Sequence, residues 1–368
     1  MSGDAITYAA AGVDTAAGDR AVDLMKEAVA RTHGPQVLGG IGAFAGLFDA
    51  SALKEYRRPL LASSTDGVGT KIVIARAMDI HHTIGQDLVA MVVDDIVVCG
   101  ATPLVMTDYI ACGKVVPERI ADIVRGIAAG CELAGTALVG GETAEHPGVM
   151  AADDYDVAGA AIGVVEADAL LGPSKVREGD VVVAMAASGL HSNGYSLVRR
   201  VVEHARWSLD TTLPDLGCTV GEELLEPTRI YAQLCVTLAA TIPGLHALSH
   251  VTGGGLAANV ARVIPEGVAA RVARDAWALP AVFSVVQAAG SVPWSDLEST
   301  LNMGVGMVAL VDAQDADALM RTCQAAGVDA WPVGEVTADD GRAASADVVR
   351  GAKGVHGGAV YLSGAYRA

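Results

Sequence analysis

The segment 84–100, IGQDLVAMVVDDIVVCG, is predicted to be a helix that is apolar on almost every side and yet carries three acids. In such a helix Asp87 and Asp94 are nearly eclipsed, and Asp95 points to the neighbouring face. An unpaired carboxylate there costs on the order of several kcal/mol, so each acid needs a cation. A divalent metal ion or a salt bridge to Lys or Arg would serve, and the metal is favoured because basic residues are scarce nearby.

Apolar strands and amphipathic helices alternate through the first half of the chain. Strands are expected at 60–65, 104–112, 137–139 and 155–165, and helices at about 19–33, 85–99 and 117–134. This order predicts an α+β layer of the ferredoxin-like type, with helices on one face of the sheet. The other face needs a cover, and sheet-to-sheet pairing with a second copy predicts a homodimer.

A second unit begins near Asp168 and is predicted to be an α/β domain. Strands are expected at 181–188, 268–274, 305–311 and 331–336, and helices at 195–206, 228–241, 256–263 and 315–326. The segment HALSH, 246–250, is expected to lie in a loop. The predicted domains are therefore 1–167 and 168–345, followed by a weakly structured tail, rich in Ala, Gly and Asp, over 346–368.

Composition excludes several classes of protein. The formal net charge of −18 repels nucleic-acid phosphate, so no nucleic-acid partner is expected. The apolar stretches are shorter than the roughly 20 residues of a membrane-spanning helix, and no secretory signal pattern opens the chain. The six cysteines form no CxxC pair and no HExxH motif is present, which predicts reduced thiols in a cytoplasmic protein without zinc.

The segment TDGVGTK, 65–71, places an acid, two glycines, a hydroxyl and a lysine directly after a predicted strand. Backbone N–H groups of such a loop can hold a phosphate, Lys71 can neutralise it and Asp66 can hold a metal ion. An ordinary glycine turn is an equal alternative, because no Walker A pattern is present.

Three further segments of the first half carry candidate groups. Residues 38–48, LGGIGAFAGLF, are too rich in glycine for a helix and too apolar for an ordinary loop, so a flexible covering segment is predicted. Asp108 lies on a predicted core strand, and Glu142 follows a buried strand in GGETAEHPG. Each acid alone is an even choice between a site residue and a structural one.

Two loops of the second unit gather polar groups. GLHSNG, 189–194, and HVTGGGL, 250–256, carry His191, Asn193, His250 and Thr252. Such groups suit ribose-phosphate binding or acid–base chemistry, and capped turns are the alternative.

Taken together, these segments resemble the phosphoribosylformylglycinamidine cyclo-ligase family over about residues 8–340. The matching segments run in order: YAAAGVD, GGIGAFAGLF, TDGVGTK, IGQDLVAMVVDDIVVCGATPL, DYIACGK, LVGGETAEHPG, YDVAGAAIGVV, ASGLHSNGYSLVR, LLEPTRIY, HVTGGGLAANVARV and LNMGVGM. The resemblance departs at Asp94, where the family has asparagine, at His146, where it has methionine, and at Leu301, where it has phenylalanine.

The resemblance implies an enzyme of purine synthesis that uses ATP and Mg²⁺ to close the imidazole ring of formylglycinamidine ribonucleotide. It implies catalytic roles for Lys71, Asp66, His191 and His250. It implies metal ligands among Asp66, Asp87, Asp94, Asp95 and Glu142. Nucleotide binding is implied for Gly40, Gly42, Asp66, Gly67, Val68, Gly69, Thr70, Lys71, Asp108, Gly140, Gly141, Glu142 and Thr143, and substrate binding for Ser192, Asn193, Thr252, Gly253, Gly254 and Asn259.

Two alternatives remain at this point. Selenophosphate synthetase shares the architecture implied by the resemblance, but it should carry a reactive cysteine and a lysine in the first glycine-rich segment, and residues 38–48 contain neither. A nucleotide-binding subunit without catalytic activity is the other, and the presence of Asp66, Lys71 and Asp95 argues against it.

Overall fold

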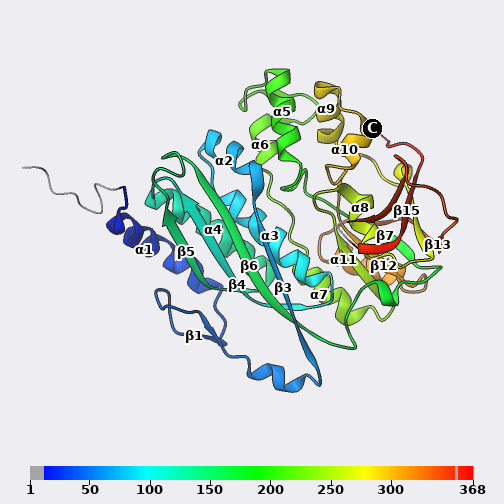
Figure 1. Ribbon diagram of the computed structural model, residues 1–368, viewed down its shortest axis with the longest axis horizontal. Coiled ribbons are helices and arrows are strands. Elements are labelled where there is room, and N and C mark those ends of the chain that lie inside the picture. The colour runs from blue at the N-terminus through cyan, green and yellow to red at the C-terminus, as the bar shows by residue number, and fades with distance from the viewer. Residues whose placement is uncertain (1–11, 353–354, 368) are drawn as a thin grey trace, which may run out of the picture.

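The computed structural model describes residues 12–352 and 355–367. The first residues of the YAAAGVD segment, 8–11, lie outside this range. The described chain forms two sheets that lie side by side, the first on the left of Figure 1 and the second on the right. Buried apolar residues from both halves belong to one continuous core, so the two domains pack against each other.

The N-terminal domain is a four-stranded sheet in the order β3-β6-β4-β5. Its strands are β3 (Pro59–Gly67), β4 (Thr102–Cys112), β5 (Ala137–Glu145) and β6 (Tyr155–Glu166), and its helices are α1 (Thr15–Arg31), α2 (Ile72–Met78), α3 (His82–Val97) and α4 (Pro117–Ala134). A short hairpin, β1 (Val37–Leu38) with β2 (Leu47–Phe48), occupies the glycine-rich segment. The α+β fold class is confirmed.

Helix α3 is buried because it lies between the sheet and α4. Glycines allow the two helices to approach: a Cβ on Gly85 would lie 2.4 Å from the Ile123 carbonyl oxygen, and one on Gly126 would lie 1.8 Å from the His82 carbonyl oxygen. The all-round apolar sequence of α3 follows from this central position.

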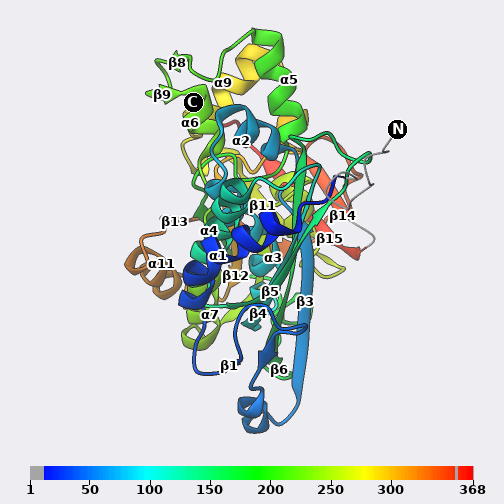
Figure 2. The same ribbon diagram turned by 90° about the vertical axis from the view of Figure 1, so that its left-hand side faces the viewer.

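The helices cover one face of this sheet and leave the other bare, as Figure 2 shows edge-on. Large apolar side chains on the bare face are exposed: Leu61 by 66%, Tyr109 by 42% and Ile162 by 41%. Such a face needs a cover, and the predicted homodimer through this sheet stays a prediction.

The C-terminal domain is a seven-stranded mixed sheet in the order β10-β12-β7-β13-β11-β15-β14. Its strands are β7 (Val181–Ala186), β10 (Leu245–His250), β11 (Val268–Ala273), β12 (Val305–Val311), β13 (Ala330–Ala338), β14 (Val348–Ala352) and β15 (Val355–Ser363). Its helices are α5 (Tyr195–Ala205), α6 (Val220–Leu225), α7 (Ala232–Thr241), α8 (Gly255–Ala261), α9 (Ala281–Gly290), α10 (Trp294–Glu298) and α11 (Ala316–Ala325), and a small hairpin pairs β8 (Thr212–Leu213) with β9 (Cys218–Thr219).

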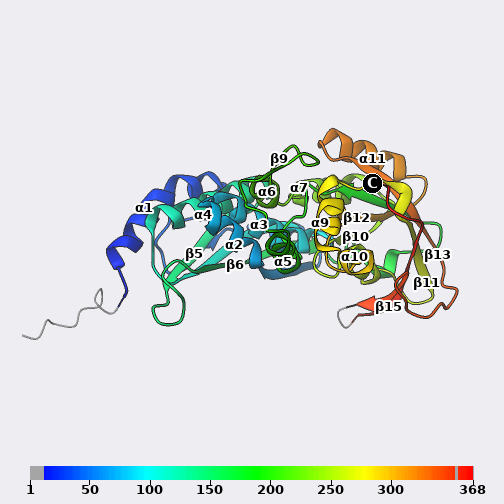
Figure 3. The same cartoon turned by 90° about the horizontal axis from the view of Figure 1, so that it is seen from above.

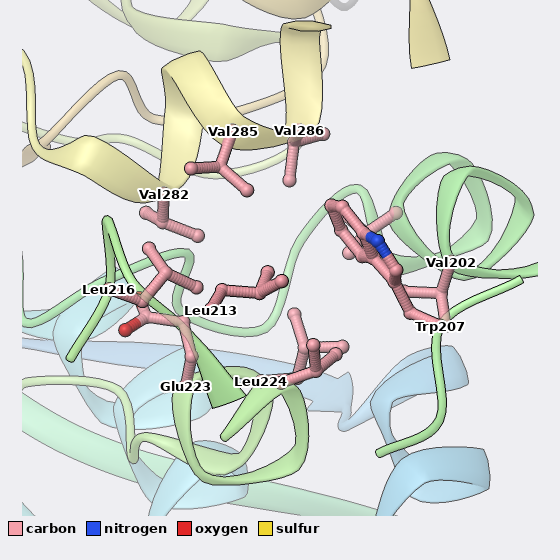
Figure 4. A pocket seen from close by; sticks show the side chains of 11 residues that line it. Val202, Trp207, Leu213, Leu216, Glu223, Leu224, Val282, Val285 and Val286 are labelled. Carbon is pink, nitrogen blue, oxygen red and sulfur yellow. The ribbon is translucent and has the colours of Figure 1, made fainter. Parts of the chain in front are cut away.

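Helices α5 and α6 lie between the two sheets in the view from above, beside α9 (Figure 3). An apolar cluster holds this part together, and Figure 4 shows side chains of α9 facing those of the β8–β9 segment. The labelled members include Trp207, Leu213, Leu216, Val282 and Val286.

Two expectations about the second half are wrong. HALSH is not a loop: it lies in β10, where every residue is buried and all residues except His246 pair with β12. The tail is not weakly structured, because β15 pairs in parallel with β11, and β14 pairs with β15. Alternation is hard to see in both segments, since one is buried on both faces and the other is rich in glycine.

All six cysteines are free. Within residues 12–352 and 355–367 there is no helix of the length and apolarity that crossing a membrane requires.

Candidate active site

A cavity of about 410 Å³ lies between α1, the β1–β2 segment and strands β4 and β5. Seven of the predicted nucleotide-binding residues line it: Gly40, Gly42, Asp108, Gly140, Gly141, Glu142 and Thr143. Apolar side chains of α1, among them Val22, Met25 and Val29, form another wall. An apolar cavity with a few convergent polar groups is typical of a site for a small organic ligand.

Asp108 is the buried acid of this cavity. Burial raises the pKa of its carboxyl to about 7. A Cβ on Gly141 would lie 1.9 Å from the Asp108 Oδ1, so glycine at 141 leaves room for the carboxyl. Strand register places Asp66, Gly159, Asp108 and Gly141 in one row across the sheet, which spans roughly 14 Å at about 4.8 Å per strand.

The TDGVGTK segment lies where the two domains meet. Asp66, near the end of β3, is exposed, and the chain then turns through Gly69, whose φ of +76° favours glycine. The Ser192 hydroxyl donates to the Val68 carbonyl oxygen at 2.7 Å, and the Thr70 and Ser196 hydroxyls lie 3.3 Å apart. Contacts across the domain boundary therefore hold this loop against the GLHSNG loop.

Lys71 does not face a phosphate-sized space, contrary to the prediction. It is fully buried, and its ammonium lies 2.9 Å from both carboxylate oxygens of Asp87. It also donates to the carbonyl oxygens of His191, at 3.1 Å, and Glu226, at 2.6 Å. Burial lowers the pKa of Lys71, and the charge of Asp87 opposes this shift. The lysine thus pairs with Asp87 within the first domain and joins the second domain through these two carbonyl oxygens.

Asp87 and Asp94 were predicted to hold a metal ion because they were expected to lack protein partners. That expectation is wrong, because both acids have protein partners. Asp87 pairs with Lys71 and accepts from the Thr228 backbone N–H and hydroxyl. Both oxygens of Asp94 lie 3.1 Å from the Tyr231 backbone N–H just before α7, and burial raises the pKa of its carboxyl to about 7. In the described part of the chain no three His, Cys, Asp or Glu side chains gather in a way that could hold a metal ion.

Asp95 stays partly exposed, by 35% of its side chain, and contacts His250 Nδ1 at 2.9 Å through Oδ1. Asp66, Asp95 and Glu142 are therefore the predicted ligands that remain accessible. Mg²⁺ is commonly held by one or two carboxylates together with substrate phosphates, and an accessible carboxylate such as that of Asp66 or Asp95 suits this role.

The two loops of the second domain are locked to each other. Asn193 Oδ1 accepts from the Gly253 backbone N–H at 2.9 Å. Thr252 and Asn259 interact through their side chains at 3.3 Å, and Asn259 Nδ2 also donates to the Thr252 carbonyl oxygen. The predicted substrate-binding residues Asn193, Thr252, Gly253 and Asn259 thus lie together.

His191 and His250 are buried within the same region. His191 has a left-handed backbone, φ +63°, and burial together with the nearby His250 and Lys71 holds its pKa well below the usual value. The neutral ring accepts from the Ser188 backbone N–H at Nε2, so its proton lies on Nδ1. Nδ1 of His191 and Nε2 of His250 have no hydrogen-bond partner among the described residues.

The segment 226–231, part of the LLEPTRIY match, supplies backbone partners of both buried acids, a role that the sequence did not indicate. Thr228 and Tyr231 bind Asp87 and Asp94 by backbone N–H groups, and Ser188 Oγ donates to the Pro227 carbonyl oxygen. The two acids signalled that partners were needed, but nothing in a linear sequence tells which distant backbone provides them.

Comparison with known proteins agrees with this architecture. The AIR synthase related protein family matches the chain in both halves, its N-terminal domain over residues 49–165 and its C-terminal domain over residues 177–346. The phosphoribosylformylglycinamidine cyclo-ligase of Desulfitobacterium hafniense is 49% identical over 331 residues, which cover 90% of this chain and 96% of the relative. The chain belongs to the phosphoribosylformylglycinamidine cyclo-ligase family.

A second member of the cyclo-ligase family, from Geobacillus kaustophilus, is 51% identical over 332 residues, covering 89% of this chain and 95% of the relative. More distant solved structures share the fold. Thiamine-monophosphate kinase from Stenotrophomonas maltophilia aligns with a TM-score of 0.67 at 19% identity, over 93% of this chain and 96% of the other. HypE from Escherichia coli aligns with a TM-score of 0.59 at 21% identity, over 86% and 89%. Identities this low show the fold alone.

Proposed function

We propose that this chain is an ATP-dependent cyclo-ligase that converts formylglycinamidine ribonucleotide into 5-aminoimidazole ribonucleotide, ADP and phosphate, a step of purine synthesis. The observation that carries the proposal is the 49% identity to a named cyclo-ligase over 90% of the chain. The cavity of the first domain supports a nucleotide site, and the GLHSNG and HVTGGGL loops of the second domain, which we call the loop cluster, support a site for the ribonucleotide.

The chemistry requires the formamide oxygen to become a leaving group. Transfer of the γ-phosphoryl group of ATP to that oxygen forms an O–P bond and releases ADP. The substrate's own amine then attacks the activated carbon, a C–N bond forms, the C–O bond breaks, and the oxygen leaves in inorganic phosphate. Phosphoryl transfer depends on positioning and charge neutralisation more than on covalent help from the protein.

The nucleotide is assigned to the cavity and to the adjoining TDGVGTK backbone. The 38–48 segment covers the cavity and would exclude water from the activated intermediate. Asp66 and Asp95, with Glu142, are the residues to hold Mg²⁺, which would neutralise the phosphate charge during transfer. Two solved relatives of the fold support a nucleotide in this architecture: HypE in complex with ATP, at a TM-score of 0.56, and Thermotoga maritima PurL complexed with AMPPCP, at 0.52.

The ribonucleotide is assigned to the loop cluster of the second domain, with Ser192, Asn193, Thr252, Gly253, Gly254 and Asn259 as its contacts. His191 can donate a hydrogen bond from Nδ1, and His250 can accept a proton at Nε2. Asp95, which contacts the other nitrogen of His250, would stabilise the imidazolium that forms. Lys71 acts here by positioning the His191 backbone.

A homodimer through the bare face of the first sheet, in the cytoplasm, completes the proposal. The exposed Leu61, Tyr109 and Ile162 support this face as the interface. The acidic surface supports small-molecule substrates, without a nucleic-acid or membrane partner.

The deciding experiment measures ADP and aminoimidazole ribonucleotide together. The proposal expects both in equal amounts, and only when ATP, Mg²⁺ and the formylglycinamidine substrate are present. ADP release without that substrate, or nucleotide binding without turnover, would favour another enzyme of the superfamily or a non-catalytic subunit.

A further inference from the structure

The C-terminal segment 347–367 follows the stretch that matches the C-terminal domain of the AIR synthase related protein family, which ends at residue 346. It adds β14 and β15 to the edge of the second sheet and then crosses to α10 and α9, near the C-terminal end marked in Figure 1. Its last described residues pair with the segment before α9: the Leu279 backbone N–H donates to the Arg367 carbonyl oxygen at 2.8 Å. The end of the tail is therefore held against the segment that precedes α9.

The anchor is a buried network around Glu298, at the end of α10. Arg274 donates to both carboxylate oxygens, at 2.6 and 2.9 Å, and these two side chains are only 13% and 11% exposed. The tail completes the network twice: the Tyr366 hydroxyl donates to Glu298 at 2.5 Å, and Asp347 accepts from Arg274 at 2.8 Å. The Tyr366 ring also packs edge-on against Trp277, with ring centroids 5.5 Å apart.

The backbone that follows Glu298 rests directly on both substrate loops. A Cβ on Gly255 would lie 1.7 Å from the Glu298 carbonyl oxygen, and one on Gly194 would lie 2.4 Å from the Leu301 side chain. Both glycines have positive φ, so a residue with a side chain at either position would be strained as well as crowded. Asn302 Nδ2 donates to the Gly189 carbonyl oxygen at 2.9 Å, which ties the same segment to the start of the GLHSNG loop.

We propose that the tail is a brace for substrate binding, in which Tyr366 positions Glu298 and thereby holds segment 298–302 against the GLHSNG and TGGG loops. Tyr366 is a positioning residue, because it acts through Glu298 and contacts no predicted substrate ligand. The inference rests on the proposed assignment of those loops to the ribonucleotide. It predicts that loosening the tail weakens binding of the ribonucleotide and spares binding of ATP, whose cavity lies in the other domain.

A control within the tail separates positioning from general stability. Arg350 on β14 forms an ion pair with Asp339 and stacks over Tyr361, so it also holds the tail. The hydrogen bonds of Arg350 do not include Glu298 or any other residue of segment 298–302. Arg350→Gln should therefore lower stability without changing the loops.

The experiment compares Tyr366→Ala, Tyr366→Phe and Arg350→Gln with the parent protein by hydrogen–deuterium exchange and by steady-state kinetics. Loss of a hydrogen bond to a charged group is worth roughly a ten- to hundredfold change in an equilibrium. We expect Tyr366→Ala to speed exchange in 192–194 and 253–255 and to raise KM for the ribonucleotide by up to roughly that factor, with KM for ATP unchanged. Tyr366→Phe keeps the ring on Trp277 and should show a smaller change of the same kind.

Unchanged loop exchange in Tyr366→Ala, or the same loop changes in Arg350→Gln, would overturn the brace. If Tyr366→Ala does not fold, the comparison of Tyr366→Phe with Arg350→Gln decides in the same way. If the parent protein does not turn over formylglycinamidine ribonucleotide, the proposed function fails, while the exchange data still decide whether the tail holds the loops.

Discussion

Breaking the Lys71–Asp87 pair should destabilise the whole protein more than it alters any single binding step. Both side chains are fully buried, and the pair holds the carbonyl oxygens of His191 and Glu226 and the backbone N–H of Thr228. Removing one member of a buried ion pair typically costs about 3–5 kcal/mol, because the other charge remains buried and unpaired. Lys71→Met should therefore lower the free energy of unfolding by about that amount.

Urea unfolding of a double-mutant cycle measures this directly. Asp87→Asn alone should also be strongly destabilising, and Lys71→Met combined with Asp87→Asn should lose clearly less than the sum of the two. Lys54→Met, at an exposed lysine, is the matched control and should stay within about 0.5 kcal/mol of the parent. A Lys71→Met protein of parental stability whose KM for ATP alone is raised would refute the ion-pair account and restore the phosphate role.

Three further changes test separate parts of the site. Burial raises the pKa of Asp94 to about 7 in the folded protein, above its unfolded value, so the parent should lose stability as pH rises from about 4 to 7. In urea unfolding, Asp94→Asn should gain on the order of 2 kcal/mol in free energy of unfolding relative to the parent between pH 5 and pH 8. A difference that does not depend on pH would contradict the burial argument. Gly141→Ala should displace the Asp108 carboxyl and raise KM for ATP severalfold with KM for the ribonucleotide unchanged; equal effects on both would remove Asp108 from the nucleotide site. Asp66→Asn, at an exposed carboxylate, should raise the Mg²⁺ concentration for half-maximal rate at unchanged thermal stability, and an unchanged titration would remove Asp66 from the ligand set.

Local patterns predicted the elements that positioned the site. Helix α4 begins and ends at the expected residues, 117 and 134, because a proline opens it and Gly135 closes it with a left-handed cap. The strand 305–311 was also expected with its observed bounds, since it is a continuous apolar run. The TDGVGTK segment could be placed because it follows a predicted strand, and the GLHSNG loop because it precedes a predicted helix.

Partners distant in the sequence could not be predicted. Asp87 was expected to need a cation, and Lys71, 16 residues earlier in the chain, provides it. Asp94 is satisfied by a backbone group 137 residues away. The tail was misjudged because its glycines look flexible, although a Cβ on Gly358 would lie 2.2 Å from the Val268 carbonyl oxygen. Glycine there serves close packing of β15 and not mobility.

The most direct test of the account follows one oxygen atom. Formylglycinamidine ribonucleotide labelled with ¹⁸O in its formyl group is turned over with unlabelled ATP, and the inorganic phosphate is analysed by mass spectrometry. Phosphorylation of the formamide oxygen predicts one ¹⁸O atom in each phosphate released. Unlabelled phosphate, with the ¹⁸O recovered in water, would contradict it.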